Sequence, residues 1–358
     1  MAKYEANSRG LDELKAAART GDFAPLYFFH GEERYLQEYY LALMVKKLVA
    51  GPMESFNYRR FAMGETTFAA VREAVEAMPM MADATLVRID DYNPFSQPKS
   101  ERIEWAALLS DIPEYCHVVF TFDAVAFSKK AAAEKDGEDT KEKDRLGDVV
   151  KQFGCEVVFD KQSPGELTEW VTRHFRAAGK KISADLCQHL IFLTDGTMTR
   201  LLREIEKIAA YSASDTIVRA DIDAVTVPTL SAALFDVSDA LAEHNYDGAL
   251  GKLDELLRLQ EEPIVILGAM GSLLRRLNLV KAATEAGKSA AEIRDLLGTK
   301  SDYYVRKLIS QSGKFSAEYL TAALDICFDA DCRLKRSMED APAVVQECIV
   351  RMAQEARK

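Results

Sequence analysis

The sequence predicts a multidomain protein in which an α/β domain is followed by all-helical domains. At 358 residues the chain exceeds the length at which one hydrophobic core stops growing, and its 48% hydrophobic residues can fill more than one core. Strand and helix patterns alternate over roughly the first 160 residues, whereas strand patterns disappear from about residue 162 onward. No period of 20–50 residues recurs, so the sequence does not predict a solenoid.

Short aromatic and β-branched runs predict the strands of the α/β domain. They are PLYFF (25–29), SFNYRRFAM (55–63), ATLVRI (84–89), CHVVFTF (116–122) and CEVVF (155–159). Helical patterns separate them, as in RYLQEYYLALMVKKLVA (34–50) and TTFAAVREAVEAM (66–78). Strands that alternate with helices favour a mainly parallel sheet with helices on its faces. The mostly charged segment 128–145 is predicted to be a solvated loop or a frayed helix.

Helix signals dominate from residue 162 to the end. Ser163 is a predicted N-cap, with Pro164 at the first helical position and Gly179 past the last. The segment TVPTL (226–230) interrupts the helical pattern, and the last two predicted helices lie one on each side of Pro342. We therefore predict three domains, which are 1–161 (α/β), 162–228 (small and helical) and 229–358 (all-helical).

Charge and cysteine spacing exclude several classes of protein. The net charge of −11 argues against an autonomous DNA-binding protein, because such binding depends on neutralising phosphates. The six cysteines form no CxxC pair, so zinc and thioredoxin-like sites lack their spacing, and reduced core cysteines are expected. The N-terminus has no apolar stretch, and the run IVILGAMGSLL is about half a membrane span. The sequence predicts a cytoplasmic protein without a membrane segment.

The loop after the first strand, HGEERYL (30–36), lacks the chemistry of a phosphate site. It offers only Gly31 and then two acids, Glu32 and Glu33, which would repel phosphate. Neither G-x-x-x-x-G-K-[ST] nor G-x-G-x-x-G occurs in the chain. His30 beside the two acids is the one acid/base candidate near a strand end, and a structural role is the commoner one for such residues. We expect no catalytic site, no cofactor and no metal site.

The segment EAMPMMADATLVRID (76–90) poses a question about two methionines. A helix is predicted to end before Pro79, and a strand follows after Met81. Met80 and Met81 then either point outward from a surface corner or fold back under the sheet. The residue pattern leaves both alternatives open.

A local excess of basic residues lies between Gly268 and Lys314, with nine Lys or Arg against four acids. Such an excess suits contact with nucleic acid or an acidic partner, and Arg275, Arg276, Arg306 and Lys307 are the candidate contacts. The alternative is that these residues are the solvated faces of helices. No RNA-recognition, zinc-finger or OB-type signature accompanies them.

Six motifs, taken in order, resemble the delta subunit of the bacterial DNA polymerase III clamp loader over essentially the whole chain. They are YFFHGEERYL (27–36), EAMPMMADATLVRID (76–90), GTMTRLLREIEKIAAY (196–211), ALFDVSDAL (233–241), EEPIVILGAMGSLLRRL (261–277) and DADCRLKRS (329–337). The resemblance implies an AAA+-like α/β domain without a P-loop (1–161), a helical lid domain (162–228) and a helical collar domain for oligomerisation (229–358).

The resemblance also implies a function in DNA replication. Delta subunits bind the β sliding clamp through a hydrophobic pair, typically Leu-Phe, at the corner that Met80 and Met81 occupy here, with Met78 and Pro79 beside them. The subunit itself binds no ATP and is not an enzyme. It opens the ring, and the implied partners are the clamp, the tau/gamma and delta-prime subunits, and primed DNA.

Two alternatives belong to other classes of protein. One is a P-loop NTPase or nucleotide transferase with a degenerate loop, which predicts measurable ATP binding. The other is a delta-prime-like structural AAA+ subunit. Delta-prime subunits usually carry zinc-binding cysteines and an S-R-C motif, and neither occurs in this sequence.

Overall fold

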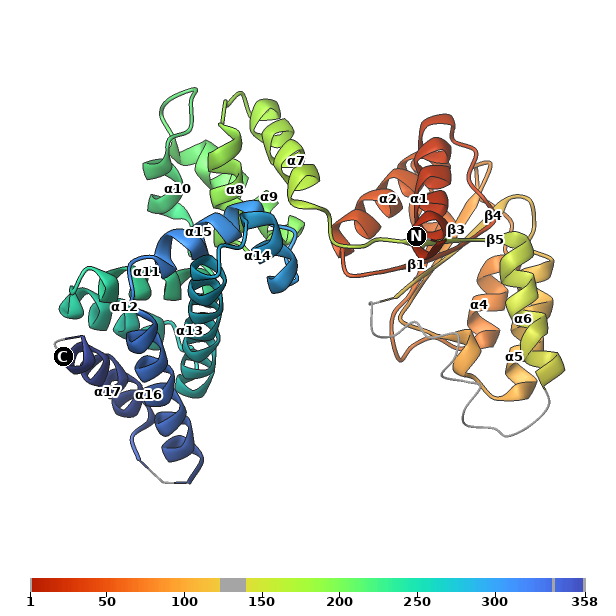
Figure 1. The fold of residues 1–358 in the computed structure, drawn as a ribbon. Coiled ribbons are helices and arrows are strands. Elements are labelled where there is room, and N and C mark those ends of the chain that lie inside the picture. Colours follow the sequence, from red (N-terminus) through yellow and green to blue (C-terminus); the bar gives the residue numbers. More distant parts are fainter. Residues whose placement is uncertain (1, 123–139, 337–338, 357–358) are drawn as a thin grey trace. The chain divides into compact units, whose positions relative to one another are not determined.

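The computed structural model describes residues 2–122, 140–336 and 339–356. The chain forms two compact units, residues 1–161 and 162–358. The first unit contains the sheet and the second is helical, as Figure 1 shows by ribbon type. The further division of the second unit at residue 228 into lid and collar stays a prediction.

A five-stranded sheet in the order β2-β3-β4-β1-β5 forms the centre of the first unit. Its strands are β1 (Leu26–His30), β2 (Tyr58–Phe61), β3 (Thr85–Asp90), β4 (Cys116–Thr121) and β5 (Gly154–Val158). Every neighbouring pair is parallel. The predicted parallel, helix-flanked sheet is confirmed.

Helices cover both faces of this sheet (Figure 1). One face packs on α1 (Ala2–Thr20) and α2 (Arg34–Leu48), and the other on α4 (Phe68–Glu76), α5 (Lys99–Ser110) and α6 (Thr140–Phe153). Strand β1 contributes side chains to the cores on both faces, because successive side chains of a strand point to opposite faces. Phe28 packs on the α4–α6 side, where it stacks on Phe120 at 4.8 Å between ring centroids, and Phe29 packs on the α1–α2 side.

The second unit consists of helices, and one core of buried apolar side chains is formed by residues between 234 and 352. The helices are α7 (Pro164–Ala177), α8 (Ala184–Leu193), α9 (Met198–Tyr211), α10 (Arg219–Val225), α11 (Leu230–Ala242), α12 (Tyr246–Arg258), α13 (Pro263–Glu285), α14 (Ala290–Leu297), α15 (Asp302–Ser312), α16 (Ala317–Arg336) and α17 (Ala341–Glu355). The predicted N-cap of the first is confirmed, since Ser163 and Glu166 form a reciprocal capping box with Pro164 in the first turn.

Helix α13 lies at the centre of the second unit and contacts α11, α15, α16 and α17. Among the described residues it is the one single helix that is long and apolar enough to cross a membrane. Its side chains instead pack in the core of residues 234–352, where Leu277 and Val280 are fully buried. Long apolar helices of this kind are also typical of protein cores.

Four local features differ from the sequence predictions or extend them. Helix α1 was not predicted. Within the predicted strand 55–63, a short helix, α3 (Glu54–Asn57), precedes β2, since a single helical turn leaves no periodicity to detect. Pro342 lies inside the first turn of α17 and not between two helices. Of segment 128–145, residues 128–139 lie outside the described residues, and residues 140–145 are the start of α6.

Candidate functional site

Residues 77–84 form an exposed corner between α4 and β3. Helix α4 ends at Glu76, Ala77 is extended, and β3 begins at Thr85. The side chains of the methionines here are solvent-accessible, with Met78 81%, Met80 47% and Met81 85% exposed. The alternative in which Met80 and Met81 fold back under the sheet is therefore wrong. Large apolar side chains that gather at an exposed site are typical of a contact surface for another protein.

Two polar side chains anchor this corner to the rest of the unit. Asn57 is 1% exposed, and its amide oxygen accepts a hydrogen bond from the Met80 N–H at 2.7 Å. Its amide nitrogen donates to the Met80 carbonyl at 2.9 Å. On the helix side, the Tyr115 hydroxyl donates to the carbonyl of Glu76 at 3.1 Å. The backbone is thus held at Glu76, just before the corner, and at Met80, in its middle, while the methionine side chains remain exposed.

Met81 adopts a left-handed backbone conformation, with φ of +52°. A non-glycine residue with positive φ is uncommon, and such strain persists where surrounding contacts impose it. Here the hydrogen bonds to Met80, the preceding residue, supply that constraint. The strain is thus located at the most exposed side chain of the corner.

The loop after β1 is closed by backbone and side-chain contacts. Gly31 has φ of +127° and lies against the backbone of Phe159. The Glu33 N–H donates to the Phe159 carbonyl at 2.9 Å. Gln37, which is buried, donates through Nε2 to the carbonyls of Gly31 at 3.2 Å and Phe122 at 3.4 Å. The space beside this loop is occupied by side chain and backbone, unlike an open phosphate cradle.

His30, Glu32 and Glu33, which the sequence suggested as an acid/base group, each contact a different partner. His30 Nε2 lies 3.0 Å from Glu156 Oε1 on the neighbouring strand β5. Glu33 is buried and accepts a hydrogen bond from the N–H of Tyr35 at the start of α2. Glu32 pairs with Lys161 at 3.3 Å. Sequence reasoning missed the histidine's partner because Glu156 is 126 residues away along the chain.

Substituting alanine at Gly31 is expected to destabilise the first unit by about 2–4 kcal/mol, from backbone strain and steric overlap together. A Cβ there would lie 2.3 Å from the Phe159 carbonyl oxygen. Gly64→Ala is the matched control, since Gly64 also has positive φ but open space around it. Urea unfolding followed by the fluorescence of Trp105 in a Trp170→Phe background measures the first unit alone, because the chain has two tryptophans. Equal losses in both variants would contradict this prediction.

A buried ionic network lies at the carboxyl ends of β3 and β4. Asp90 Oδ1 accepts hydrogen bonds from Arg88 Nε and Thr121 Oγ1, both at 2.6 Å. Arg60 Nε donates to Asp90 Oδ2 at 2.7 Å. Arg88 also forms a bidentate pair with Glu38 on α2, at 2.9 and 2.5 Å. The Asp90 carboxylate, at a strand end where a metal ligand often lies, is occupied by protein donors.

This network is expected to make the first unit acid-sensitive. Burial opposes ionisation of Asp90, but hydrogen bonds from Thr121, Arg88 and Arg60 outweigh it and lower the pKa of Asp90. A lowered pKa in the folded state stabilises the fold above the unfolded value of about 3.9, and this contribution is lost as pH falls through the folded pKa. The stability deficit of Asp90→Asn should therefore shrink as urea unfolding is repeated from pH 6 to pH 3. A difference in unfolding free energy between wild type and Asp90→Asn that does not vary with pH would contradict the lowered pKa of Asp90.

The basic candidates lie on two helices of the second unit. Arg275 and Arg276 are exposed on α13, and Arg276 donates to the Tyr304 hydroxyl at 2.7 Å. Arg306, on α15, is exposed and donates to Gln188 at 3.2 Å. Lys307 is half-buried, with its ammonium 4.4 Å from the Phe192 ring centroid, and burial lowers its pKa.

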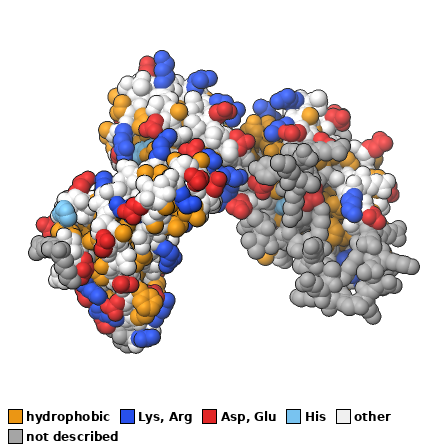
Figure 2. Space-filling model, in the orientation of Figure 1, with side chains coloured by type: hydrophobic (Ala, Val, Ile, Leu, Met, Phe, Trp, Pro, Cys, Tyr) orange, Lys and Arg blue, Asp and Glu red, His pale blue; other side chains and the backbone are white. Residues whose placement is uncertain are grey.

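The two helices thus bring Arg276 and Lys307 to one aromatic cluster, in which Phe192 and Tyr304 are stacked. On the face of this unit shown in Figure 2, Lys and Arg are interspersed with Asp and Glu. Contact of the four basic residues with DNA or a partner stays a prediction.

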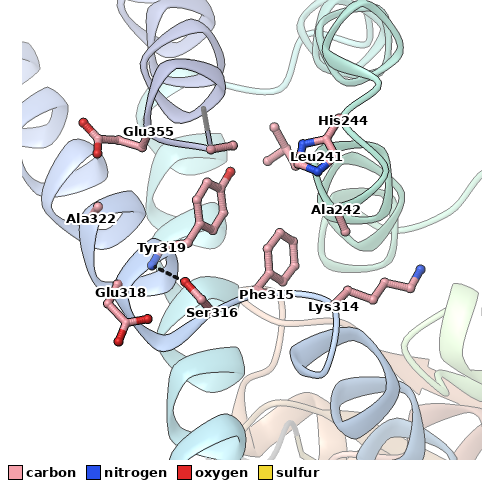
Figure 3. A pocket seen from close by; sticks show the side chains of 11 residues that line it. Leu241, Ala242, His244, Lys314, Phe315, Ser316, Glu318, Tyr319, Ala322 and Glu355 are labelled. Carbon is pink, nitrogen blue, oxygen red and sulfur yellow. Dashed lines mark hydrogen bonds between the residues drawn. The ribbon is translucent and has the colours of Figure 1, made fainter. Parts of the chain in front are cut away.

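A separate pocket lies among the carboxyl end of α11, the start of α16 and the end of α17 (Figure 3). Phe315 and Tyr319 stack in it at 5.3 Å between ring centroids, and the Tyr319 N–H donates to Ser316 Oγ at 3.0 Å. Lys314 at its edge pairs with Asp239 at 2.9 Å. None of the site residues predicted from the sequence lines this pocket. Across the part of the chain that the structure describes, no cluster of three metal-ligating side chains occurs.

The parallel sheet in the order β2-β3-β4-β1-β5, flanked by helices and followed by a helical unit, is an AAA+-like fold. Two sequence models of one family match the chain. "DNA polymerase III, delta subunit" matches residues 27–134, and "DNA polymerase III delta subunit, C-terminal domain" matches residues 231–352. Together these matches span more than half of the chain, and the chain belongs to the family of DNA polymerase III delta subunits.

Individual relatives agree with this assignment. The DNA polymerase III subunit delta of Bacillus subtilis is 21% identical over 344 residues, 95% of this chain and 96% of that protein. A probable DNA polymerase III subunit delta of Aquifex aeolicus is 26% identical over 165 residues, 45% of this chain and 47% of that protein. The solved structure of the Bacillus subtilis DNA clamp loader delta protein has a similar fold, with a TM-score of 0.54 and 17% identity over 96% of this chain and 99% of that one.

Proposed function

We propose that this protein binds the ring-shaped β sliding clamp through the corner at residues 77–84 and opens the ring for loading onto primed DNA. The observation that carries the proposal is the exposure of Met80 and Met81 on a backbone that Asn57 holds in place. Methionine is apolar, long and adaptable, so the pair suits an apolar pocket on a partner. Membership of the delta subunit family supports the choice of partner.

Binding at this corner opens the ring only if the open form is bound better than the closed form. The protein then shifts the clamp's conformational equilibrium by the difference between the two binding free energies. No chemical step on this chain is needed for such a shift. We therefore propose a non-catalytic role for this subunit. It works in the cytoplasm, and the tau/gamma subunits of the assembly hydrolyse ATP.

Contacts at the β1 loop support a subunit that does not bind ATP. Gln37 and the Phe159 backbone occupy the loop, and Glu32 and Glu33 place negative charge there. A degenerate NTPase is the less favoured alternative, because these contacts would have to break before a phosphate could enter. Titration with a fluorescent ATP analogue distinguishes the two, and saturable binding would favour the NTPase.

The remaining partners follow from the family. We propose that the second unit joins the tau/gamma and delta-prime subunits through its collar part, residues 229–358, and that primed DNA passes within the assembly. Because acids are interspersed with Lys and Arg on the face of the second unit shown in Figure 2, we propose that this unit contacts DNA as one part of such an assembly and not by itself.

Release of a closed ring from circular DNA tests ring opening directly. Clamps are first placed on nicked circular DNA by the complete clamp loader, which is then removed. Because a closed ring cannot leave a circle, this protein alone, without ATP, should accelerate clamp release. Linearised DNA is the control, since rings slide off its ends in either case. A release rate that this protein leaves unchanged on circular DNA would contradict the proposal.

A further inference from the structure

We infer that Asn57 is a positioning residue for clamp binding, which holds the Met80–Met81 backbone in its binding conformation; this inference rests on the proposed function. The residue lies at the end of α3, on a different element from the methionines, and 23 residues before Met80. Its side chain is 1% exposed, so it does not itself present a surface to a partner.

The geometry resembles one rung of a β-ladder made by a side chain. Asn57 accepts from the Met80 N–H at 2.7 Å and donates to the Met80 carbonyl at 2.9 Å. Both polar groups of one residue are therefore bound to one planar amide. This fixes the peptide planes on either side of Met80 relative to β2, which begins at Tyr58.

The side-chain directions of both methionines follow from this constraint. Met80 is the bonded residue, and Met81 follows it with φ of +52°. A left-handed methionine is strained, and an unconstrained loop would leave that conformation. Without the amide, the corner would have to be ordered when the partner binds, and such ordering weakens affinity.

The two hydrogen bonds of Asn57 are expected to affect the conformation of the corner more than the stability of the first unit. Both partners of the Asn57 amide belong to residue 80, on an exposed corner, where water can replace the lost hydrogen bonds. We therefore expect Asn57→Ala to loosen the corner while the first unit remains folded. Thermal unfolding and the exchange rate of the Met80 amide proton measure these two effects separately. The amide proton should lose its protection in Asn57→Ala.

A double-mutant cycle on clamp affinity tests the inference. Clamp binding is titrated for the wild type, Asn57→Ala, Met80→Ala/Met81→Ala and the triple variant. Asn57→Ala should weaken binding by roughly tenfold, because the corner must be ordered on binding. The same substitution should change affinity less than about twofold once both methionines are absent, since it acts through them.

Two further variants complete the test. Asn57→Asp keeps an acceptor for the Met80 N–H but, when ionised, sets a second carboxylate oxygen against the Met80 carbonyl in place of the donor, so it should weaken clamp binding at least as much as Asn57→Ala. Asn93→Ala is the matched control, because Asn93 also binds main chain, accepting from the Phe95 N–H at 3.0 Å in another loop of this unit. Its clamp affinity should equal that of the wild type.

The possible results separate this inference from the proposed function. Wild-type affinity in Asn57→Ala, or an equal loss with and without the methionines, would overturn the positioning role while clamp binding stands. A wild-type protein that does not bind the clamp would overturn both. Loss of affinity only where the methionines are present, together with faster exchange at Met80, is the result that the inference predicts.

Discussion

Replacing Met80 and Met81 together by alanine is expected to weaken binding to the β sliding clamp by a hundredfold or more. Burying two methionine side chains is worth roughly 3–6 kcal/mol by transfer from water. Ordering costs reduce this to about 3 kcal/mol, which corresponds to the hundredfold change. Titration calorimetry against the clamp of the same organism measures it.

Met63 supplies the matched control for this prediction. It is 75% exposed in the same unit, but it follows the carboxyl end of β2, whereas the corner precedes the amino end of β3. Since β2 and β3 are parallel, Met63 lies beyond the carboxyl ends of the strands and the corner lies before their amino ends. Met63→Ala should therefore bind the clamp as the wild type does. Unchanged binding in the double variant would move the clamp contact away from the corner.

Arg88→Met is expected to destabilise the first unit by about 3–5 kcal/mol, because it leaves the buried Asp90 carboxylate without its principal partner. Arg88 is 5% exposed and binds both Asp90 and Glu38. Urea unfolding followed by Trp105 fluorescence in the Trp170→Phe background measures the loss.

Arg60→Ala distinguishes the buried pair from an exposed one in the same network. The Arg60 side chain is 57% exposed, although it binds the same aspartate at 2.7 Å. Solvent screening limits such a pair to about 1 kcal/mol or less. A second comparison is Arg88→Met/Asp90→Asn, which should recover part of the stability, because no unpaired charge remains buried. Equal losses for Arg88→Met and Arg60→Ala would show that burial does not govern this network.

The sheet could be predicted from the sequence because its strands are buried on both faces. Runs such as PLYFF and CHVVFTF are almost continuously apolar, which is typical of parallel sheets covered by helices. The helix start at Ser163 and Pro164 could also be predicted, since a capping box depends only on residue types within four consecutive positions. Helix α1 gives only a weak signal, because Leu11 and Leu14 are its only large aliphatic residues and Gly10 lies inside it.

The candidate site was predictable only in part. A helix end, a proline and a following strand predicted a corner at Met80 and Met81, but methionine is equally suited to a core and a surface, so exposure stayed open. Asn57 gave no signal of its role, because its partner is 23 residues away and asparagine is common in turns. The same holds for Arg88, whose charge inside a strand is accounted for only by partners on other elements.

The most direct test of the central claim is to observe the methionine methyl groups while the clamp is added. With ¹³C-labelled methionine methyls, Met80 and Met81 signals can be assigned from single substitutions, and buried Met270 and Met352 in the second unit serve as references. We predict that the Met80 and Met81 signals shift or broaden on clamp binding while the two references do not change. Clamp binding detected by calorimetry with unchanged Met80 and Met81 signals would contradict the assignment of the corner as the clamp-binding site.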